Sequence, residues 1–388
     1  MPLAKDLFDT FQHLDISENP WVLIGNIINY ARDTMGANVM NVFASGYDIE
    51  EFHSDVEQKL LTAIEEHKRG VDRQVEIIHL LGVYTQLIYF FACIVNRIQN
   101  GPISPAHIRI GSALTPDDTV ITFNWDCLMD RALATTGTWA TDYGYGLKPK
   151  MVFRDGWVQP SSAATRSGPL LLKLHGSSNW ITSCMMMDWD KHQFDLIQNA
   201  GPDVFYAFDF ARQPYPAYAG RFMPGYEEFS YGYYPPNILD DPGKSARPDH
   251  VLMQMRPKWP WMPESKTSDK GLITMPLIIP PVKQKSYELF GELFSTLWRK
   301  AEDSLVAADH IIIIGYSFPR TDHKSVSLFK NAFCRRRTMP KVTIVDPYPQ
   351  RAAELFHSTL GITEARLNIR AEGFSETSDI DGLLRPTK

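Results

Sequence analysis

Two short polar side chains, Asn124 and Asp126, stand where an apolar run opens into a helical pattern. The stretch is VITFNWDCLMDRAL, residues 120–133. Its first four residues are β-type, and the spacing after Asp126 is that of an amphipathic helix. In an open parallel sheet ligands bind beyond the carboxyl ends of the strands, so an amide and a carboxylate there are candidate ligand contacts. Asn and Asp are also favoured helix caps, and that alternative stays open.

Three further apolar runs end in residues of the same kind. These residues are His175, Gly176 and Ser177 at the end of GPLLLKLHG, Gly315, Tyr316 and Ser317 at the end of HIIIIGYS, and Asp346 after KVTIV. Each has a plainer reading: a hydrogen-bonded structural histidine, a tight turn, or a turn-forming aspartate before proline. Four strand ends that all carry site-type residues together favour a ligand site.

Strand and helix patterns alternate around these ends. Strands are expected at 119–123, 168–176, 310–317 and 341–347, and helices at 20–34, 48–69, 73–99, 284–307, 322–337 and 348–359. Buried strands that alternate with helices predict an α/β fold with a Rossmann-like, doubly wound parallel sheet. We expect a single domain over 1–375, with a helical subregion at about 20–110, core strands at about 119–176 and 310–347, and a tail at 376–388.

Residues 182–281 break this alternation. The segment is rich in Pro, Tyr, Trp, Met and Gly, which disfavours long helices. It is too aromatic to be disordered. We therefore expect an irregular insertion packed on the core.

The bulk composition describes an ordinary globular chain. Its 388 residues are 44% hydrophobic and 22% charged, and its net charge of −6 argues against nucleic acid as a main partner. The four cysteines form no C-x-x-C pair, so a zinc ribbon is excluded and a cytoplasmic location is expected. The apolar run 77–98 has the length of a membrane span, but polar residues interrupt it, and we interpret it as a buried core helix rather than a membrane segment.

The strand-end motifs resemble the sirtuin fold, and specifically the Sir2-like domains of bacterial anti-phage defence proteins. T-F-N-W-D at 122–126 is similar to the sirtuin T-Q-N-I-D element, and K-L-H-G-S at 173–177 to the strand that carries the catalytic histidine. G-Y-S at 315–317 is similar to a nucleotide-ribose loop, and V-D-P at 345–347 to the position near the adenine ribose. DYGYG at 142–146 and PLIIPP at 276–281 also match this group.

This resemblance implies an NAD hydrolase that breaks the nicotinamide–ribose bond and depletes NAD in antiviral defence. It places Asn124 and His175 as the catalytic pair, the first to orient a water or a ribose hydroxyl and the second as general base. NAD-binding residues would be Thr122, Asp126, Gly176, Gly315, Tyr316, Ser317 and Asp346. NAD would be the substrate, and no metal would be required. The alternative within the same fold is a weak or inactive subunit that serves assembly or nucleotide sensing.

Two departures from the family bear on this expectation. The missing zinc ribbon favours water over an acetyl-lysine peptide as the acceptor. The chain opens with MPLAKDLF, which resembles the segment that follows the family's G-A-G-x-S phosphate loop, so that loop is expected to be absent. The resemblance also implies a homo-oligomer and a separate sensor or activator, such as a HerA-like ATPase or a short Argonaute.

Overall fold

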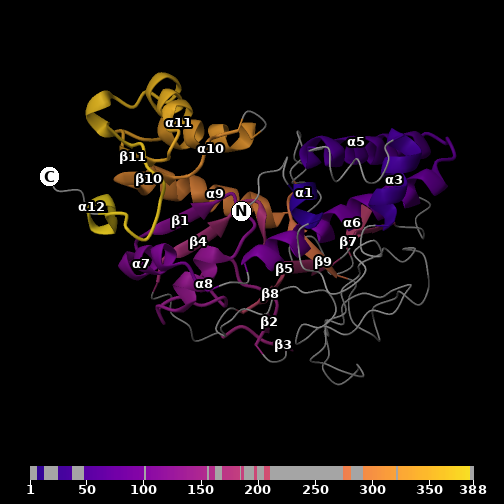
Figure 1. Cartoon of the computed structure of the whole chain (residues 1–388), viewed down its shortest axis with the longest axis horizontal. Helices are drawn as coiled ribbons and strands as arrows, with labels where there is room; N and C mark the ends of the chain where they lie inside the picture. The colour runs from indigo at the N-terminus through magenta and orange to yellow at the C-terminus, as the bar shows by residue number, and fades with distance from the viewer. Residues whose placement is uncertain are drawn as a thin grey trace.

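A computed structural model gives the architecture (Figure 1). It describes residues 7–12, 25–36, 48–99, 102–154, 157–161, 168–183, 185–187, 196–198, 205–209, 274–280, 292–319 and 322–384. The fold is mixed α/β, as expected from the alternating pattern.

Five parallel strands form the part of the fold that carries the predicted strand ends. β1 (Thr119–Thr122) pairs in register with β4 (Leu170–Lys173). β11 (Lys341–Val345) lies between β10 (His310–Ile314) and β12 (Leu367–Arg370). All four predicted strands are confirmed, although they end one to three residues earlier than expected. Of these five parallel strands, β12 alone was not expected from the sequence, because its residues LNIR do not form a continuous apolar run.

The predicted single doubly wound sheet is not seen as such. Within the described ranges, β1 and β4 form one sheet and β10, β11 and β12 another. Among the described strands, one edge of β1 and one edge of β10 pair with no other strand, and a cavity of about 640 Å³ lies between these edges. Sequence patterns could not reveal this division into two sheets, because they are local, whereas the neighbours of a strand are set by tertiary structure.

Helices cover these strands and supply the core. They are α8 (Leu128–Ala134), α9 (Glu292–Ala307), α10 (His323–Cys334) and α11 (Gln350–Glu354), which continues as a π-helical turn to Thr359. Phe294, Leu297 and Ala301 of α9 are fully buried in one hydrophobic cluster with Leu171 and Leu172 of β4. α9 packs against both β4 and α10. The predicted helix at 284–307 is confirmed over its described part, and residues 284–291 lie outside the described ranges.

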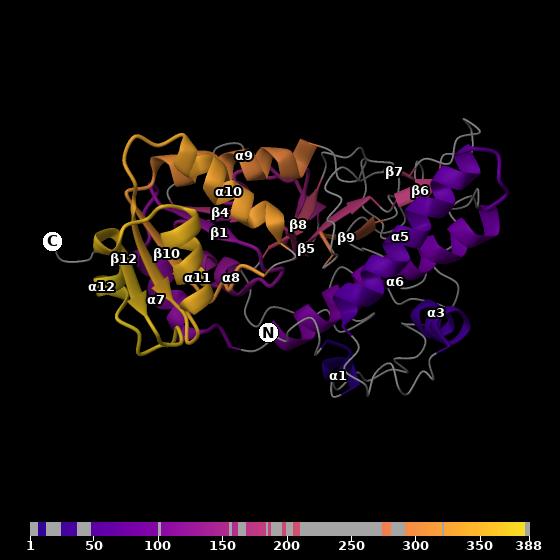
Figure 2. The same cartoon turned by 90° about the horizontal axis from the view of Figure 1, so that it is seen from above.

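The helical subregion projects from the sheets as an antiparallel arm (Figure 2). It comprises α1 (Leu7–Gln12), α3 (Gly25–Met35), α5 (Ile49–Lys68) and α6 (Gln74–Gln99). α7 (Pro105–Ala113) lies at the other end of the molecule, where it packs against α8 (Figure 1). The side chain of Asp48 accepts a hydrogen bond from the amide of Glu50 at 2.8 Å, so the expected start of α5 is confirmed. α6 is long and apolar enough to cross a membrane, but 82% of its most apolar window is buried inside the molecule.

A third sheet, of mixed strand direction, was not expected from the sequence. Its order is β3 (Trp157–Val158), β2 (Val152–Phe153), β8 (Tyr206–Phe208), β5 (Gly176–Ser183) and β9 (Thr274–Ile278). A further pair joins β6 (Met185–Met187) to β7 (Leu196–Gln198). The described parts of residues 182–281 therefore include paired strands, which corrects the expectation of an irregular insertion. The remainder of that segment lies outside the described ranges.

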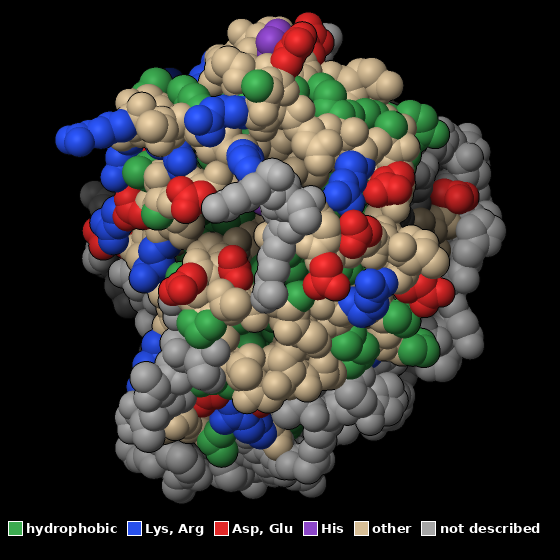
Figure 3. Space-filling view, turned by 90° about the vertical axis from the view of Figure 1, so that its left-hand side faces the viewer, with side chains coloured by type: hydrophobic (Ala, Val, Ile, Leu, Met, Phe, Trp, Pro, Cys, Tyr) green, Lys and Arg blue, Asp and Glu red, His purple; other side chains and the backbone are tan. Residues whose placement is uncertain are grey.

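The expected tail at 376–388 is also corrected over its described part. α12 (Ile380–Leu384) packs on α7 and buries Ile380 and Leu383. The guanidinium of Arg109 donates to the carbonyl oxygen of Glu376. Figure 3 shows this end of the molecule, where Lys and Arg side chains are interleaved with Asp and Glu side chains. The described side chains on that face therefore form no large patch of a single charge sign.

Candidate functional site

His175 occupies the turn between β4 and β5 and is buried. Its Nδ1 lies 3.1 Å from the carbonyl oxygen of Phe123, the residue next to the end of β1. Its Nε2 lies 3.7 Å from Oδ2 of Asp322, which is buried as well. Both ring nitrogens thus face oxygen atoms, and the two oxygens come from segments far apart in the chain.

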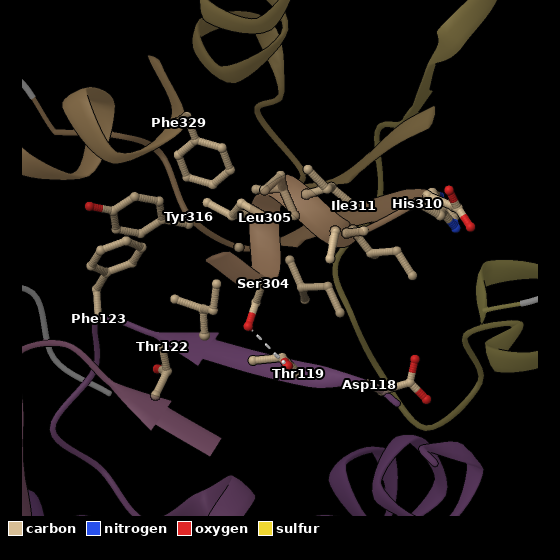
Figure 4. A pocket seen from close by; sticks show the side chains of 18 of the residues that line it. Asp118, Thr119, Thr122, Phe123, Ser304, Leu305, His310, Ile311, Tyr316 and Phe329 are labelled. Atoms are coloured by element: carbon tan, nitrogen blue, oxygen red, sulfur yellow. Dashed lines mark hydrogen bonds between the residues drawn. The ribbon is translucent and has the colours of Figure 1, made fainter. Parts of the chain in front are cut away.

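Asp322 precedes α10 and connects His175 to the end of β10. The Tyr316 hydroxyl donates to Oδ2 of Asp322 at 2.6 Å. The Tyr316 ring stacks on Phe123 with centroids 4.4 Å apart, as Figure 4 shows for the two labelled rings. This stack holds the carboxyl ends of β1 and β10 together. Three of the four predicted strand ends therefore meet at one place.

An aromatic and cationic wall stands beside this cluster. The His175 ring lies 6.2 Å from the ring of Trp298 on α9. Lys324 Nζ lies 4.7 Å from the centroid of the same Trp298 ring, at cation–π distance. Burial lowers the pKa of Lys324 to about 8, although the nearby carboxylate of Asp322 opposes that shift. A partly desolvated ammonium at this position can attract an anionic or carbonyl group of a ligand.

Asn124 and Thr122 lie at the open side of the same region. The backbone amide of Asn124 donates to Thr122 Oγ1 at 3.1 Å, and Asn124 itself is exposed. Asn124, Gly315 and Tyr316 line the carboxyl end of the cavity between β1 and β10. The Asn124 amide is therefore available to a ligand that approaches the strand ends.

Asp126 has a structural task. Its Oδ1 accepts a hydrogen bond from the amide of Leu128 at 3.1 Å in the first turn of α8. This bond satisfies the first amide of α8, although the residue at the N-cap position of that helix is Cys127. Its carbonyl oxygen also accepts from Lys173 Nζ, which forms a fully buried ion pair with Asp130 at 3.0 Å. Burial disfavours the charge on Lys173, but Asp130 and the other nearby anions outweigh burial and raise its pKa.

Gly176 and Ser177 are likewise fixed by packing. Gly176 has φ +80°, and a Cβ there would meet the carbonyl oxygen of Leu277 at 2.0 Å. The Ser177 hydroxyl is buried and donates to Asn179 Oδ1 at 2.5 Å. Neither residue needs a ligand to explain its type.

The ends of β10 and β11 lie side by side. The Gly315 amide donates to the carbonyl oxygen of Val345 at 3.0 Å. Gly315 has φ +61° with open space around its Cα, and Ser317 is exposed. Asp346 Oδ1 accepts from the amide of Tyr348 at 2.7 Å, which is the turn-forming role considered above. Its other carboxylate oxygen can still accept a hydrogen bond from a hydroxyl group.

Sequence reasoning missed Asp322, Lys324 and Phe123. Asp322 ends the stretch IIIIGYSFPRTD, residues 311–322, where its type and its place before a helix indicate only a cap. In the structure no side-chain cap hydrogen bond forms at that position of α10. The carboxylate turns to Tyr316 and His175 instead, which a local pattern cannot reveal.

The cavity behind the strand ends has open backbone edges on two sides (Figure 4). The carbonyl oxygens of Asp118 and Thr122 accept hydrogen bonds from the amides of Leu170 and Leu174. Because successive residues of a strand point their backbone groups to opposite sides, those of Thr119 and Ile121 point to the cavity. Across it, Asp309 and Gly315 bond to β11, and the groups of His310, Ile312 and Ile314 point to the cavity. One hydrogen bond spans the floor, from Ser304 Oγ of α9 to Thr119 Oγ1 at 3.3 Å.

Within the described ranges, no cluster of three or more His, Cys, Asp or Glu side chains could hold a metal ion. Comparison with known proteins adds no family: no protein-family model and no curated protein matches the chain.

Proposed function

We propose that this protein is an NAD hydrolase that cleaves the bond between nicotinamide and ribose. The observation that carries the proposal is that Phe123, the residue before Asn124, contacts both His175 and Tyr316, so that the carboxyl ends of β1, β4 and β10 meet. Dinucleotides bind at such a crevice in doubly wound folds. We also propose that the two parallel sheets form a Rossmann-like fold and that the chain is a Sir2-like domain, as the resemblance of its strand ends implies.

Different strand ends would bind the adenosine half and the nicotinamide half of NAD. Gly315 has open space around its Cα, and the exposed Ser317 and the Asp346 carboxylate lie on adjoining strand ends, where they can contact the adenosine half. The nicotinamide ribose would lie near Asn124 and His175. Thr122 would then act through its hydrogen bond to the Asn124 backbone, and Asp126 and Gly176 would shape the site through packing alone.

Hydrolysis needs a base and an oriented acceptor rather than a redox partner. A water oxygen forms a bond to the ribose C1′ while the C1′–N bond breaks, and its electron pair leaves with neutral nicotinamide. The water proton passes to His175, whose imidazole is the side chain suited to proton transfer near neutral pH. Asn124 orients the water or a ribose hydroxyl. ADP-ribose and nicotinamide are the products, and the proton is returned to solvent.

The biological setting that we propose is antiviral defence by NAD depletion in the cytoplasm. The subunit would work as a homo-oligomer with a separate sensor or activator, of the HerA-like or short-Argonaute kind. Support for this setting comes only from the motif resemblance.

The test is to incubate the pure protein with NAD and to measure the released nicotinamide and ADP-ribose by chromatography. His175→Ala and Asn124→Ala are each expected to reduce turnover by about 100-fold, the usual contribution of one acid–base or orienting group. Matched controls are His357→Ala, whose Nδ1 also bonds a backbone carbonyl, and the exposed Asn368→Ala. Equal turnover in wild type and in both site variants would overturn the catalytic assignment.

The open cavity directly behind Asn124 and Gly315 favours one alternative, a subunit that binds the nucleotide without turning it over. Calorimetric binding of NAD with no nicotinamide release, alone and with the partner, would establish that role in place of hydrolysis.

A further inference from the structure

We propose that Asp322 is the positioning carboxylate of His175, and that it stabilises the imidazolium that forms when Nε2 takes up a proton. The role in turnover rests on the proposed function. The geometry of the pair does not, because it is a property of the ligand-free protein.

The first step concerns which nitrogen carries the proton. The carbonyl oxygen of Phe123 can only accept a hydrogen bond, so Nδ1 of His175, 3.1 Å away, must be the donor. In the neutral ring Nε2 then keeps its lone pair. This assignment makes Nε2 the basic atom, and it fixes the ring orientation from the end of β1.

The second step concerns what Nε2 faces. Oδ2 of Asp322 lies 3.7 Å from Nε2, longer than a hydrogen bond but within ion-pair distance. Both side chains are nine-tenths or more buried, with exposed fractions of 5% and 3%. Burial weakens screening, so a proton on Nε2 would interact strongly with this carboxylate.

The third step concerns how the carboxylate is held. The Tyr316 hydroxyl donates to the same Oδ2 at 2.6 Å. Tyr316 is in turn stacked on Phe123, the residue that orients Nδ1. Among the described residues, Lys324, two residues beyond Asp322, is a further charged group near this carboxylate. One closed set of contacts thus links the ends of β1, β4 and β10 through the imidazole.

Asp322 is a positioning residue in this scheme and does not touch the reacting atoms. It resembles the third member of other nucleophile–base–orienter arrangements, where a buried carboxylate fixes the tautomer and orientation of a histidine. Here the orientation of the neutral ring comes from a backbone carbonyl, and the carboxylate acts on the protonated ring.

The test uses Asp322→Asn, which keeps the shape and removes the charge, and Tyr316→Phe, which removes one hydrogen bond to Oδ2. Asp303→Asn is the control, because Asp303 lies at the surface in an ion pair with Arg335. The activity-independent readout is the nitrogen NMR spectrum of His175 in the ligand-free protein, followed through a pH titration. Thermal unfolding of each variant reports whether it is folded.

In wild type we expect the proton of the neutral ring on Nδ1. In Asp322→Asn, His175 should become protonated only at lower pH than in wild type. In Tyr316→Phe the pH of protonation should lie between these two, and in Asp303→Asn it should equal that of wild type. If NAD is hydrolysed, kcat should fall about 100-fold in Asp322→Asn with KM within about threefold, and the acidic limb of the pH–rate profile should move to lower pH. Unchanged titration in a folded Asp322→Asn and in Tyr316→Phe would overturn the proposal, whether or not NAD is hydrolysed. A shifted titration without any NAD hydrolysis would support the pair and contradict only the proposed reaction.

Discussion

His175 Nε2 lies 3.7 Å from Asp322 Oδ2, although the two residues are 147 positions apart in the chain. The contact joins the turn after β4 to the loop before α10. It is possible because Phe123 and Tyr316 stack between the ends of β1 and β10. A ligand at these strand ends would therefore meet a site whose members restrain one another.

Gly176 should be intolerant of any side chain. Gly176→Ala places a Cβ 2.0 Å from the carbonyl oxygen of Leu277, in addition to the cost of φ +80°. We expect a loss of about 2 to 5 kcal/mol in the free energy of unfolding, measured by denaturant titration. Gly361→Ala is the control, because Gly361 has φ +73° and nothing within 4 Å. Its expected cost is about 1 to 2 kcal/mol. Equal losses would show that β9 does not approach Gly176 as described.

His53 should make the protein sensitive to acid. It is fully buried on α5 between the rings of Tyr84 and Phe91, at centroid distances of 4.9 and 5.9 Å. Burial lowers its pKa from 6.5 to about 3. A lowered pKa means that the unfolded chain binds the proton first, so stability falls as pH drops from 6.5 toward 3.

Replacement by Phe removes this proton uptake. His53→Phe should reduce the loss of unfolding free energy across that pH window by several kcal/mol, at about 1.4 kcal/mol per pH unit. The surface variant His323→Gln serves as control. An acid dependence in His53→Phe as steep as in wild type would contradict the burial of a neutral imidazole.

The facing edges of β1 and β10 should exchange their amide hydrogens readily. The amides of Ile121 and Ile312 point to the cavity, whereas those of Val120 and Ile313 point to β4 and β11. Residue-resolved hydrogen exchange should show faster exchange at the first two, because a ladder hydrogen bond protects an amide. Equal protection on both sides would contradict the assignment of these two edges as unpaired.

The sequence by itself determined the local elements. Apolar β-branched runs such as HIIII and KVTIV form strands wherever they are buried, and Asp48 with two following glutamates begins a helix on local grounds. The same local chemistry placed Asn124, His175 and Tyr316 at strand ends. The same pattern left capping and ligand binding both open for Asp126, whose carboxylate accepts a hydrogen bond from the Leu128 amide.

Only the tertiary structure decided which of these ends share a site. Sheet order, the cavity between β1 and β10, and the mixed sheet around β5 depend on pairings between distant segments. Asp322 reads as a helix cap in the chain and becomes a partner of His175 in the fold. The physical reason is that a side chain's electrostatic role depends on burial and on neighbours brought by packing, and neither is encoded within one local window.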